Sequence, residues 1–348
     1  MSRIAIIGAG AWGTALSIVL GRSDRHELSL WAYEKEVRES ILATRKNSVF
    51  LPETRIPDCV KPTGDFGEAL RGAEIVVSAM PSQHCRRLFE QMAPHLRPET
   101  LVVSATKGLE EATLMRMTEV ISDVTARQRL QVRIGALSGP TFAAEVARGD
   151  PTAITMASND SELAKKVQRE FSDPAFRVYT NNDVVGVELG GALKNIIAIA
   201  AGVCHGLGLG HNSIAALITR GLTEISRLAV ACGGRAETMS GLAGLGDLVL
   251  TCTGALSRNR SVGVELGRGR KLPEILASMH GMVAEGVFTT NAAVQLAKDR
   301  DVEMPITEQM HAVLNEGRPP REAIHALMTR ISKPESELLA QQGRISNH

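Results

Sequence analysis

Short apolar runs alternate with longer amphipathic stretches over the first half of the chain. Runs typical of buried strands cover residues 3–7, 26–31, 74–79, 101–105, 132–137 and 152–156. Helix-like stretches, such as 11–20 and 85–93, lie between them. Uninterrupted apolar runs such as IAII and EIVVSA are typical of strands that are buried on both faces. The pattern therefore predicts an α/β fold with a doubly wound, mostly parallel sheet covered by helices.

Beyond about Asp183 the apolar spacing becomes helical throughout. Helices are expected over residues 184–203, 213–232, 290–298 and 306–315, with glycine-rich loops between them and no further strand. We therefore expect an α/β domain over 1–185, an all-helical domain over 186–335 and a loosely ordered tail over 336–348. No Pro/Ser-rich linker separates the two domains, so close packing between them is expected.

Composition narrows the class of protein. The net charge is +1 and aromatic residues make up 3% of the 348 residues, which argues against a nucleic-acid partner. Five cysteines are widely spread without a C-x-x-C pair, as in a reducing cytoplasm. The apolar run over 196–210 contains His205 and several glycines and is too short for a membrane span. We expect a cytoplasmic protein with no stable membrane association, whose apolar helical half offers a face for a homodimer.

A glycine motif connects the first strand to the first helix. Residues 8–13 read GAGAWG, a G-x-G-x-x-G in the context that makes this motif specific for dinucleotides. Gly8 permits a tight turn, Gly10 lets the main chain approach a pyrophosphate, and Gly13 allows close packing of helix on strand. Ala11 and Trp12 open the helix, whose N–H groups attract phosphate. The first domain is thus expected to be a Rossmann-type domain that binds NAD or NADP.

The end of the second strand bears on the choice of cofactor. Glu34 stands close to where an acidic residue binds the adenosine ribose and selects NAD, although slightly late. Tyr33 could stack on adenine or simply cap a surface loop, while Lys35 and Arg38 could accept a 2′-phosphate. These residues favour NAD weakly and leave dual use open.

Lys194 is the only charge in the apolar stretch LGGALKNIIAIAAG over residues 189–202. On a helix it shares a face with Gly190, Gly191 and Ala198, where a small molecule could approach the amine. Burial would lower the pKa of such a lysine toward the range of proton transfer. The alternative is a surface lysine that extends out of an apolar helix. Asn195 follows it, either as a hydrogen-bonding group or as an ordinary helix-surface residue.

Three further parts of the sequence contain candidate site residues. Lys107 follows a strand at its carboxyl end, where α/β sheets collect ligands. Asp247 is expected in a partly buried loop, paired with Lys194 or capping the next helix. Ser257, Arg258 and Asn259 precede a helical stretch and resemble an anion site, because guanidinium groups bind phosphate bidentately.

Arg260 and Arg268 are expected to be solvated. No metal site is evident, since His205 and His211 lie six residues apart rather than four.

These motifs occur together in one family. GAGAWGT, SATKGLE, SGPTFAAEV, GGALKNIIAIAAG, GLAGLGDLVLTCTG and SRNRSVG, in this order, closely resemble the bacterial NAD(P)-dependent glycerol-3-phosphate dehydrogenases over Ile4 to about Arg330. The resemblance implies reversible reduction of dihydroxyacetone phosphate to glycerol 3-phosphate, the backbone precursor of phospholipids. Lys194 matches the catalytic lysine of the family, which exchanges the proton at the carbinol oxygen. The two domains would then bind the dinucleotide and the substrate, respectively.

The resemblance also implies the contacts of the site. Substrate contacts would come from Lys107, Gly139, Thr141, Lys194, Asp247, Ser257, Arg258 and Asn259. Cofactor contacts would come from Gly8, Gly10, Ala11, Trp12, Gly13, Tyr33, Lys107, Ala143, Arg258, Val283 and Glu285. Ala11 stands where many relatives carry serine, a loss that main-chain N–H groups should tolerate.

Two alternatives remain from the sequence. A dehydrogenase of similar architecture that acts on a β-hydroxyacid or on ketopantoate would also carry the lysine, but not the Ser257–Asn259 phosphate site. A non-catalytic dinucleotide sensor would keep the glycine loop without needing Lys107, Lys194 and Asp247 together.

Overall fold

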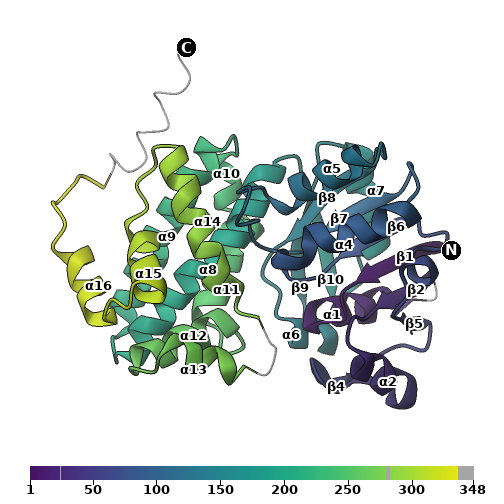
Figure 1. The fold of residues 1–348 in the computed structure, drawn as a ribbon, viewed down its shortest axis with the longest axis horizontal. Helices are drawn as coiled ribbons and strands as arrows, with labels where there is room; N and C mark the ends of the chain where they lie inside the picture. Colours follow the sequence, from purple (N-terminus) through teal and green to yellow (C-terminus); the bar gives the residue numbers. More distant parts are fainter. Residues whose placement is uncertain (24, 280–282, 336–348) are drawn as a thin grey trace, which may run out of the picture. The chain divides into compact units, whose positions relative to one another are not determined.

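The computed structural model describes residues 1–23, 25–279 and 283–335 (Figure 1). Its contacts divide the chain into two compact units. The first comprises Met1–Lys107 and Met117–Val184, and the second comprises Gly108–Arg116 and the chain from Val185 onward. The tail expected over 336–348 lies outside the described residues.

The first unit is built on an eight-stranded sheet. The strands of this unit are β1 (Ser2–Ile7), β2 (His26–Trp31), β3 (Lys46–Asn47), β4 (Leu51–Arg55), β5 (Val60–Thr63), β6 (Ile75–Ser78), β7 (Leu101–Ser104), β8 (Arg133–Ser138), β9 (Thr152–Ala157) and β10 (Phe176–Asn181). The sheet runs in the order β10-β9-β8-β7-β6-β1-β2-β5, and all neighbours are parallel except β8 and β9. β3 and β4 form a separate antiparallel pair. The predicted mostly parallel sheet is confirmed.

Two of the strands that the sequence analysis did not predict, β5 and β10, were missed for the same reason. β5 and β10 lie at the two edges of the sheet, where only part of each strand is buried. β5 even contains Pro62, which an edge strand tolerates because one side of its backbone needs no partner. Edge strands lack the continuous apolar run by which the central strands are recognised.

Helices follow most strands of the first unit. They are α1 (Ala11–Leu20), α2 (Lys35–Thr44), α3 (Phe66–Leu70), α4 (Cys85–Met92), α5 (Met117–Arg127), α6 (Ala143–Arg148) and α7 (Ser161–Phe171), with short 3₁₀ turns at Ser82–His84 and Ala93–His95. α1 packs beside α6, and α4 packs beside α5. In Figure 1 the purple β1 lies next to the blue β6, so segments distant along the chain form the centre of the sheet.

The second unit is helical over its described residues. Its helices are α8 (Val184–Gly206), α9 (His211–Ala231), α10 (Ala236–Met239), a π-helical turn (Leu242–Gly246), α11 (Asp247–Thr253), α12 (Arg258–Gly267), α13 (Leu272–Ala277), α14 (Glu285–Asp299), α15 (Pro305–Asn315) and α16 (Pro320–Met328). No strand is found among the described residues beyond Asn181. The four helices predicted from the apolar spacing are present, each with its ends within five residues of the expected bounds.

α8 is the central helix of this unit. It is long and apolar enough to cross a membrane, yet 94% of its most apolar window is buried inside the protein. α12 approaches it closely through glycines: a Cβ on Gly202 would lie 2.0 Å from the Arg260 carbonyl oxygen, and one on Gly263 would lie 1.9 Å from that of Ile199. Burial of this helix therefore comes from close helix packing, which larger residues at these positions would prevent.

The segment Gly108–Arg116 belongs to the helical unit although it follows β7 in sequence. It closes on itself through a bridge between Leu109 and Arg116, and Leu109 is buried in the core of the second unit. Arg116 Nη1 lies 2.6 Å from Glu188 Oε2 on α8. Since Lys107 directly precedes this segment, its backbone is covalently tied to a part of the helical unit.

Glu224 of α9 is a buried carboxylate that binds the start of another helix. Its oxygens accept the main-chain N–H groups of Ile306 (2.7 Å) and Thr307 (3.2 Å), and it is only 2% exposed. These donors belong to the first turn of α15, whose N–H groups have no partners within the helix. Burial nevertheless outweighs these hydrogen bonds and raises the pKa of Glu224 to about 7.

Replacement of Glu224 with Gln should change how stability depends on pH. Because its folded-state pKa lies above the unfolded value, the folded protein binds more protons between about pH 4.5 and 7. Ionisation of Glu224 therefore lowers the free energy of unfolding as pH rises through this window. The loss reaches about 3 kcal/mol once the pH lies above both pKa values. Urea denaturation at several pH values should show E224Q gaining stability relative to the unchanged protein toward pH 8. A constant difference across this range would contradict the shifted pKa.

Candidate active site

The glycine loop has the geometry that the sequence predicts. Gly8 has φ +113°, and a Cβ there would lie 2.8 Å from the Ala79 carbonyl oxygen. A Cβ on Gly13 would lie 1.9 Å from the carbonyl oxygen of Gly8, so only glycine lets α1 pack on this turn. A Cβ on Gly10 would meet nothing within 4 Å, which leaves open space beside the first turn of α1. A pyrophosphate fits this arrangement, because main-chain N–H groups border space that no side chain fills.

The turn after β2 carries both a carboxylate and a cation. Tyr33 is 68% exposed, and Glu34 is the residue before the first turn of α2. Arg38 donates from Nη1 to the carbonyl oxygens of Ala32 (2.6 Å) and Tyr33 (2.9 Å), which holds its guanidinium at this turn. A carboxylate for a ribose diol and a cation for a 2′-phosphate therefore occupy the same turn, and the weak preference for NAD stays a prediction.

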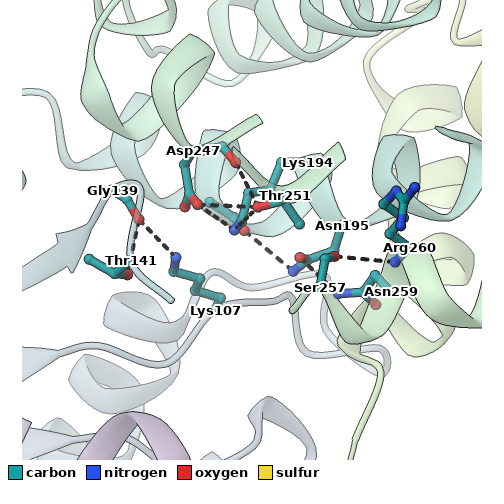
Figure 2. Close-up of polar contacts among 11 residues, drawn as sticks. Lys107, Gly139, Thr141, Lys194, Asn195, Asp247, Thr251, Ser257, Asn259 and Arg260 are labelled. Atoms are coloured by element: carbon teal, nitrogen blue, oxygen red, sulfur yellow. Dashed lines mark hydrogen bonds and ion pairs between the residues drawn. The ribbon is translucent and has the colours of Figure 1, made fainter. Parts of the chain in front are cut away.

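Three predicted site residues lie together at the carboxyl ends of β7 and β8. The Lys107 amine donates to the Gly139 carbonyl oxygen over 3.4 Å, and the Thr141 hydroxyl donates to the same oxygen over 3.1 Å (Figure 2). Gly139 has φ +158°, and a Cβ there would lie 3.1 Å from the Ile154 Cα atom. Ala143 begins α6 two residues after Thr141. The SGPTFAAEV segment thus begins at the carboxyl end of β8, beside Lys107.

Lys194 is buried and paired. It is 5% exposed, and its amine lies 2.5 Å from Asp247 Oδ1 and 2.7 Å from Thr251 Oγ1 (Figure 2). Asp247 is 1% exposed. The predicted pairing of these two residues is confirmed, and the alternative of a lysine extended into solvent is wrong. Each charge compensates the other, which makes their burial tolerable.

Gly190, one of the small residues on the lysine face of α8, serves helix packing. A Cβ on Gly190 would lie 2.7 Å from the Ala243 carbonyl oxygen, so the π-helical turn occupies the space expected to be open there. This contact places the turn, and the helix after it, against α8. Gly190 therefore brings Asp247 to Lys194 rather than clearing a path to the amine.

Asp247 lies in a helix rather than in the expected loop. It is the first residue of α11, directly after the π-helical turn Leu242–Gly246. The glycine-rich sequence suggests a loop, but a Cβ on Gly244 would lie 2.2 Å from the Met239 carbonyl oxygen, so glycine here permits a compact helical turn. The alternative role as a helix cap is also wrong, because Gly246 holds the cap position and the Asp247 carboxylate binds Lys194.

Thr251 is a site residue that the sequence analysis missed. Its hydroxyl donates to the Asp247 carbonyl oxygen over 2.6 Å and accepts from the Lys194 amine. The spacing D-x-x-x-T within a helix places both side chains on one face, and this was the signal available in the sequence. Cys252 lies next to Thr251, and burial raises the pKa of its thiol to about 12. This thiol therefore stays protonated at neutral pH.

The Ser257–Asn259 segment forms the start of α12 instead of preceding it. Ser257 is the cap, and its hydroxyl accepts the main-chain N–H of Arg260 over 3.2 Å. Arg258 is exposed in the first turn, while Asn259 is 9% exposed. Asn195 is 4% exposed and accepts a hydrogen bond from Asn259, so it is not a helix-surface residue. A serine hydroxyl, a guanidinium and helix N–H groups thus share one turn, as an anion site requires.

The remaining predicted residues have mixed outcomes. Arg260 is half-buried with its Nε inside the protein, so the expectation of a solvated charge is wrong. Arg268 is exposed beside Glu265, as expected. Val283 lies in the irregular segment before α14, and Glu285 is the first residue of that helix. Their proposed contacts with cofactor stay predictions. Among residues 1–23, 25–279 and 283–335, no group of three His, Cys, Asp or Glu side chains could hold a metal ion.

The glycine loop on a doubly wound sheet and the buried Lys–Asp pair in a helical unit define a class: dinucleotide-dependent dehydrogenases of the Rossmann type with a helical second unit. Two family models match the chain: the N-terminus of NAD-dependent glycerol-3-phosphate dehydrogenase over residues 3–164 and the C-terminus of the same family over residues 183–325. The chain belongs to this family.

Individual relatives agree with the family. A glycerol-3-phosphate dehydrogenase [NAD(P)+] of Koribacter versatilis is 68% identical over 335 residues, which cover 96% of this chain and 99% of the relative. The crystal structure of glycerol-3-phosphate dehydrogenase from Coxiella burnetii has a TM-score of 0.90 at 41% identity and covers 94% of this chain and 99% of that one. A ketopantoate reductase from Ralstonia eutropha, with a TM-score of 0.57, 19% identity and coverage of 93% of this chain and 100% of that one, shares the fold alone.

The buried pair predicts a specific pattern of stability. Replacing Asp247 with Leu leaves the Lys194 ammonium buried without its counter-ion and should lower the free energy of unfolding by about 3–5 kcal/mol. Adding Lys194→Met should restore most of this loss, because the second change removes the uncompensated charge. Urea denaturation of D247L and of the double variant tests this. A double variant that is less stable than D247L would contradict the coupling of the two charges.

Proposed function

We propose that the chain catalyses the reversible reduction of dihydroxyacetone phosphate to sn-glycerol 3-phosphate with NADH or NADPH. The observation that carries this proposal is the buried Lys194–Asp247 pair. By resemblance, its lysine matches the catalytic lysine of the family. The two family models and the relative at 68% identity support it, because all three are named for glycerol-3-phosphate dehydrogenase activity.

The proposed chemistry needs one hydride and one proton. Bound NAD(P)H supplies the hydride to carbon 2 of the substrate. Lys194 donates a proton to the oxygen on that carbon as the carbonyl becomes an alcohol, and its amine takes the proton back in the oxidation. Asp247 and Thr251 hold the lysine amine from two sides, so the amine cannot rotate freely away from the substrate oxygen.

The phosphate of the substrate is proposed to bind at the start of α12. Ser257 and Arg258 contribute a hydroxyl and a guanidinium, and the first N–H groups of the helix add partial positive charge. Lys107, Gly139 and Thr141 are proposed as further substrate contacts, with Asp247 acting through Lys194. Val283, Glu285, Ala143, Tyr33 and the 8–13 loop are proposed to bind the cofactor, with Lys107 and Arg258 near both ligands.

The cellular setting is a separate part of the proposal. A reductase of this kind would supply the glycerol backbone of phospholipids from a cytoplasmic metabolite. The wide spread of the five cysteines along the sequence, without a C-x-x-C pair, supports a reducing compartment. A homodimer through the helical half is proposed without a residue assignment.

Lys194→Ala should lower kcat about a hundredfold to ten-thousandfold, since a positioned general acid contributes that much. The assay follows nicotinamide absorbance with dihydroxyacetone phosphate, with NADH and NADPH in parallel. Dinucleotide affinity, measured by fluorescence titration, should stay unchanged. Lys298→Ala, an exposed lysine on α14, is the matched control and should behave as the unchanged chain. Tight dinucleotide binding without turnover by the unchanged chain would favour the sensor instead.

Arg258→Ala tests the phosphate site separately. It should lower kcat/KM for dihydroxyacetone phosphate about tenfold to a hundredfold, as loss of a charged hydrogen bond does. Activity on unphosphorylated dihydroxyacetone should fall much less, because that substrate offers no anion to the guanidinium and loses only the proposed cofactor contact. Equal losses on both substrates would show that Arg258 does not bind phosphate.

A further inference from the structure

The side-chain amide of Asn47 joins the β3–β4 hairpin to the glycine loop. Its Nδ2 donates to the Ala9 carbonyl oxygen over 2.8 Å and to Thr14 Oγ1 over 2.9 Å. Its Oδ1 accepts the main-chain N–H of Phe50 over 3.0 Å. Asn47 and Thr14 are fully buried, and Ala9 is 2% exposed. A buried amide therefore bridges the glycine loop and a segment that lies 38 positions farther along the chain.

The partners of Asn47 determine which way its amide faces. The Phe50 N–H can only donate, so it faces the amide oxygen, and the Ala9 carbonyl oxygen can only accept, so it faces the amide nitrogen. The Thr14 hydroxyl donates to the same carbonyl oxygen over 3.3 Å. Two fully buried side chains, Asn47 and Thr14, therefore hold the Ala9 carbonyl toward the interior of the protein.

The direction of this carbonyl sets the direction of the next N–H group. The Ala9–Gly10 peptide is trans, and the carbonyl and N–H of a planar trans peptide point in nearly opposite directions. Because the Ala9 carbonyl points inward, the Gly10 N–H points away from Asn47. Gly10 is the residue before the first turn of α1, where N–H groups have no partner within the helix. Its backbone also borders open space, since a Cβ on Gly10 would meet nothing within 4 Å.

The hairpin gives Asn47 a fixed support. β4 packs against both α1 and α6 (Figure 1). Leu51, the first residue of β4, belongs to the apolar core of the sheet unit. The Phe50 N–H that binds the Asn47 oxygen directly precedes this buried residue. The amide of Asn47 therefore reaches the glycine loop from a part of the fold that is itself anchored in the core.

We propose that Asn47 is a positioning residue of the dinucleotide site: it holds the Ala9 carbonyl inward so that the Gly10 N–H faces the pyrophosphate. This inference rests on the proposed binding of the cofactor by the 8–13 loop. Asn47 is fully buried, so it acts through the loop and does not touch the ligand. Without its amide the peptide is free to rotate, and a carbonyl turned outward would repel the phosphate oxygens.

Asn47→Ala should raise the dissociation constant of NADH about tenfold to a hundredfold, as the loss of a hydrogen bond to a charged group does. Fluorescence titration measures this constant. ADP-ribose, which keeps the pyrophosphate and lacks nicotinamide, should lose affinity by the same factor in calorimetry. The KM for dihydroxyacetone phosphate should not rise and kcat at saturating NADH should not fall, because Lys194 and its partners belong to the other unit. A loss confined to kcat would overturn the proposal.

Thr14→Val provides a second variant, because it nearly keeps the shape of the side chain and removes the other donor to the Ala9 carbonyl. It should weaken NADH binding in the same direction as Asn47→Ala. Full NADH affinity of either folded variant would overturn the proposal.

Ser158→Ala is the matched control, because Ser158 is also a buried side chain that binds two main-chain groups of the same unit. Its hydroxyl donates to the Ile134 carbonyl oxygen over 2.9 Å and accepts the Asp160 N–H over 3.1 Å. Asn47→Ala and Ser158→Ala should both lose stability in urea denaturation, but only Asn47→Ala should lose NADH affinity. Equal losses of affinity would show a general effect on the fold and would overturn the proposal.

The NMR signal of the Gly10 amide tests the orientation directly. In protein with ¹⁵N-labelled glycine, NAD⁺ should move the Gly10 proton signal downfield as its hydrogen bond to phosphate forms. The movement should be much smaller in Asn47→Ala, even when NAD⁺ saturates the variant. The same movement in the saturated variant would overturn the proposal. Dinucleotide binding that leaves this signal unmoved in the unchanged chain would overturn this inference alone, whereas no dinucleotide binding would overturn the proposed cofactor site with it.

Discussion

Burial of one lysine ammonium is the constraint on which the helical unit depends. An ion removed from water costs several kcal/mol unless a counter-ion and hydrogen bonds replace the solvent. Asp247 and Thr251 provide these for Lys194, and both come from α11. The helix that carries Lys194 and the helix that carries its partners must therefore pack in one arrangement. A small displacement between them would leave two buried charges uncompensated.

Glycines make that arrangement possible. Gly190 lets the π-helical turn before α11 approach α8, and Gly202 and Gly263 let α12 approach α8 farther along. Gly286 likewise lets the start of α14 approach Asn195 and Asn259. In each case a methyl group would overlap main-chain or side-chain oxygen, so the cost of a substitution is steric and direct. The other helices of this unit thus pack closely on α8, and the site residues of the unit lie at these close contacts.

Much of the site could be predicted from local sequence. The GAGAWG loop is specific because strand, turn and helix follow one another within a few residues, and an isolated charge in the apolar α8 segment marks Lys194. Asp247 was correctly paired with Lys194 but wrongly placed in a loop, because glycine-rich sequence indicates a turn unless packing stabilises a helix. The role of Thr251 and the hydrogen-bond partners of Asn259 could not be predicted in this way. These contacts depend on which helices pack against each other, and a pattern within one short segment does not show that.

The sequence by itself determined the fold class, the glycine loop and the type of residue at the site, because those follow from periodicity and from chemistry within short segments. Tertiary structure decided the rest. It assigned Gly108–Arg116 to the helical unit, since Leu109 finds its apolar partners there and Arg116 finds Glu188. It placed β5 and β10 at the edges of the sheet, where partial burial suffices. It also brought the Asn47 amide to the Ala9 carbonyl oxygen, because that contact joins residues 38 positions apart in the chain.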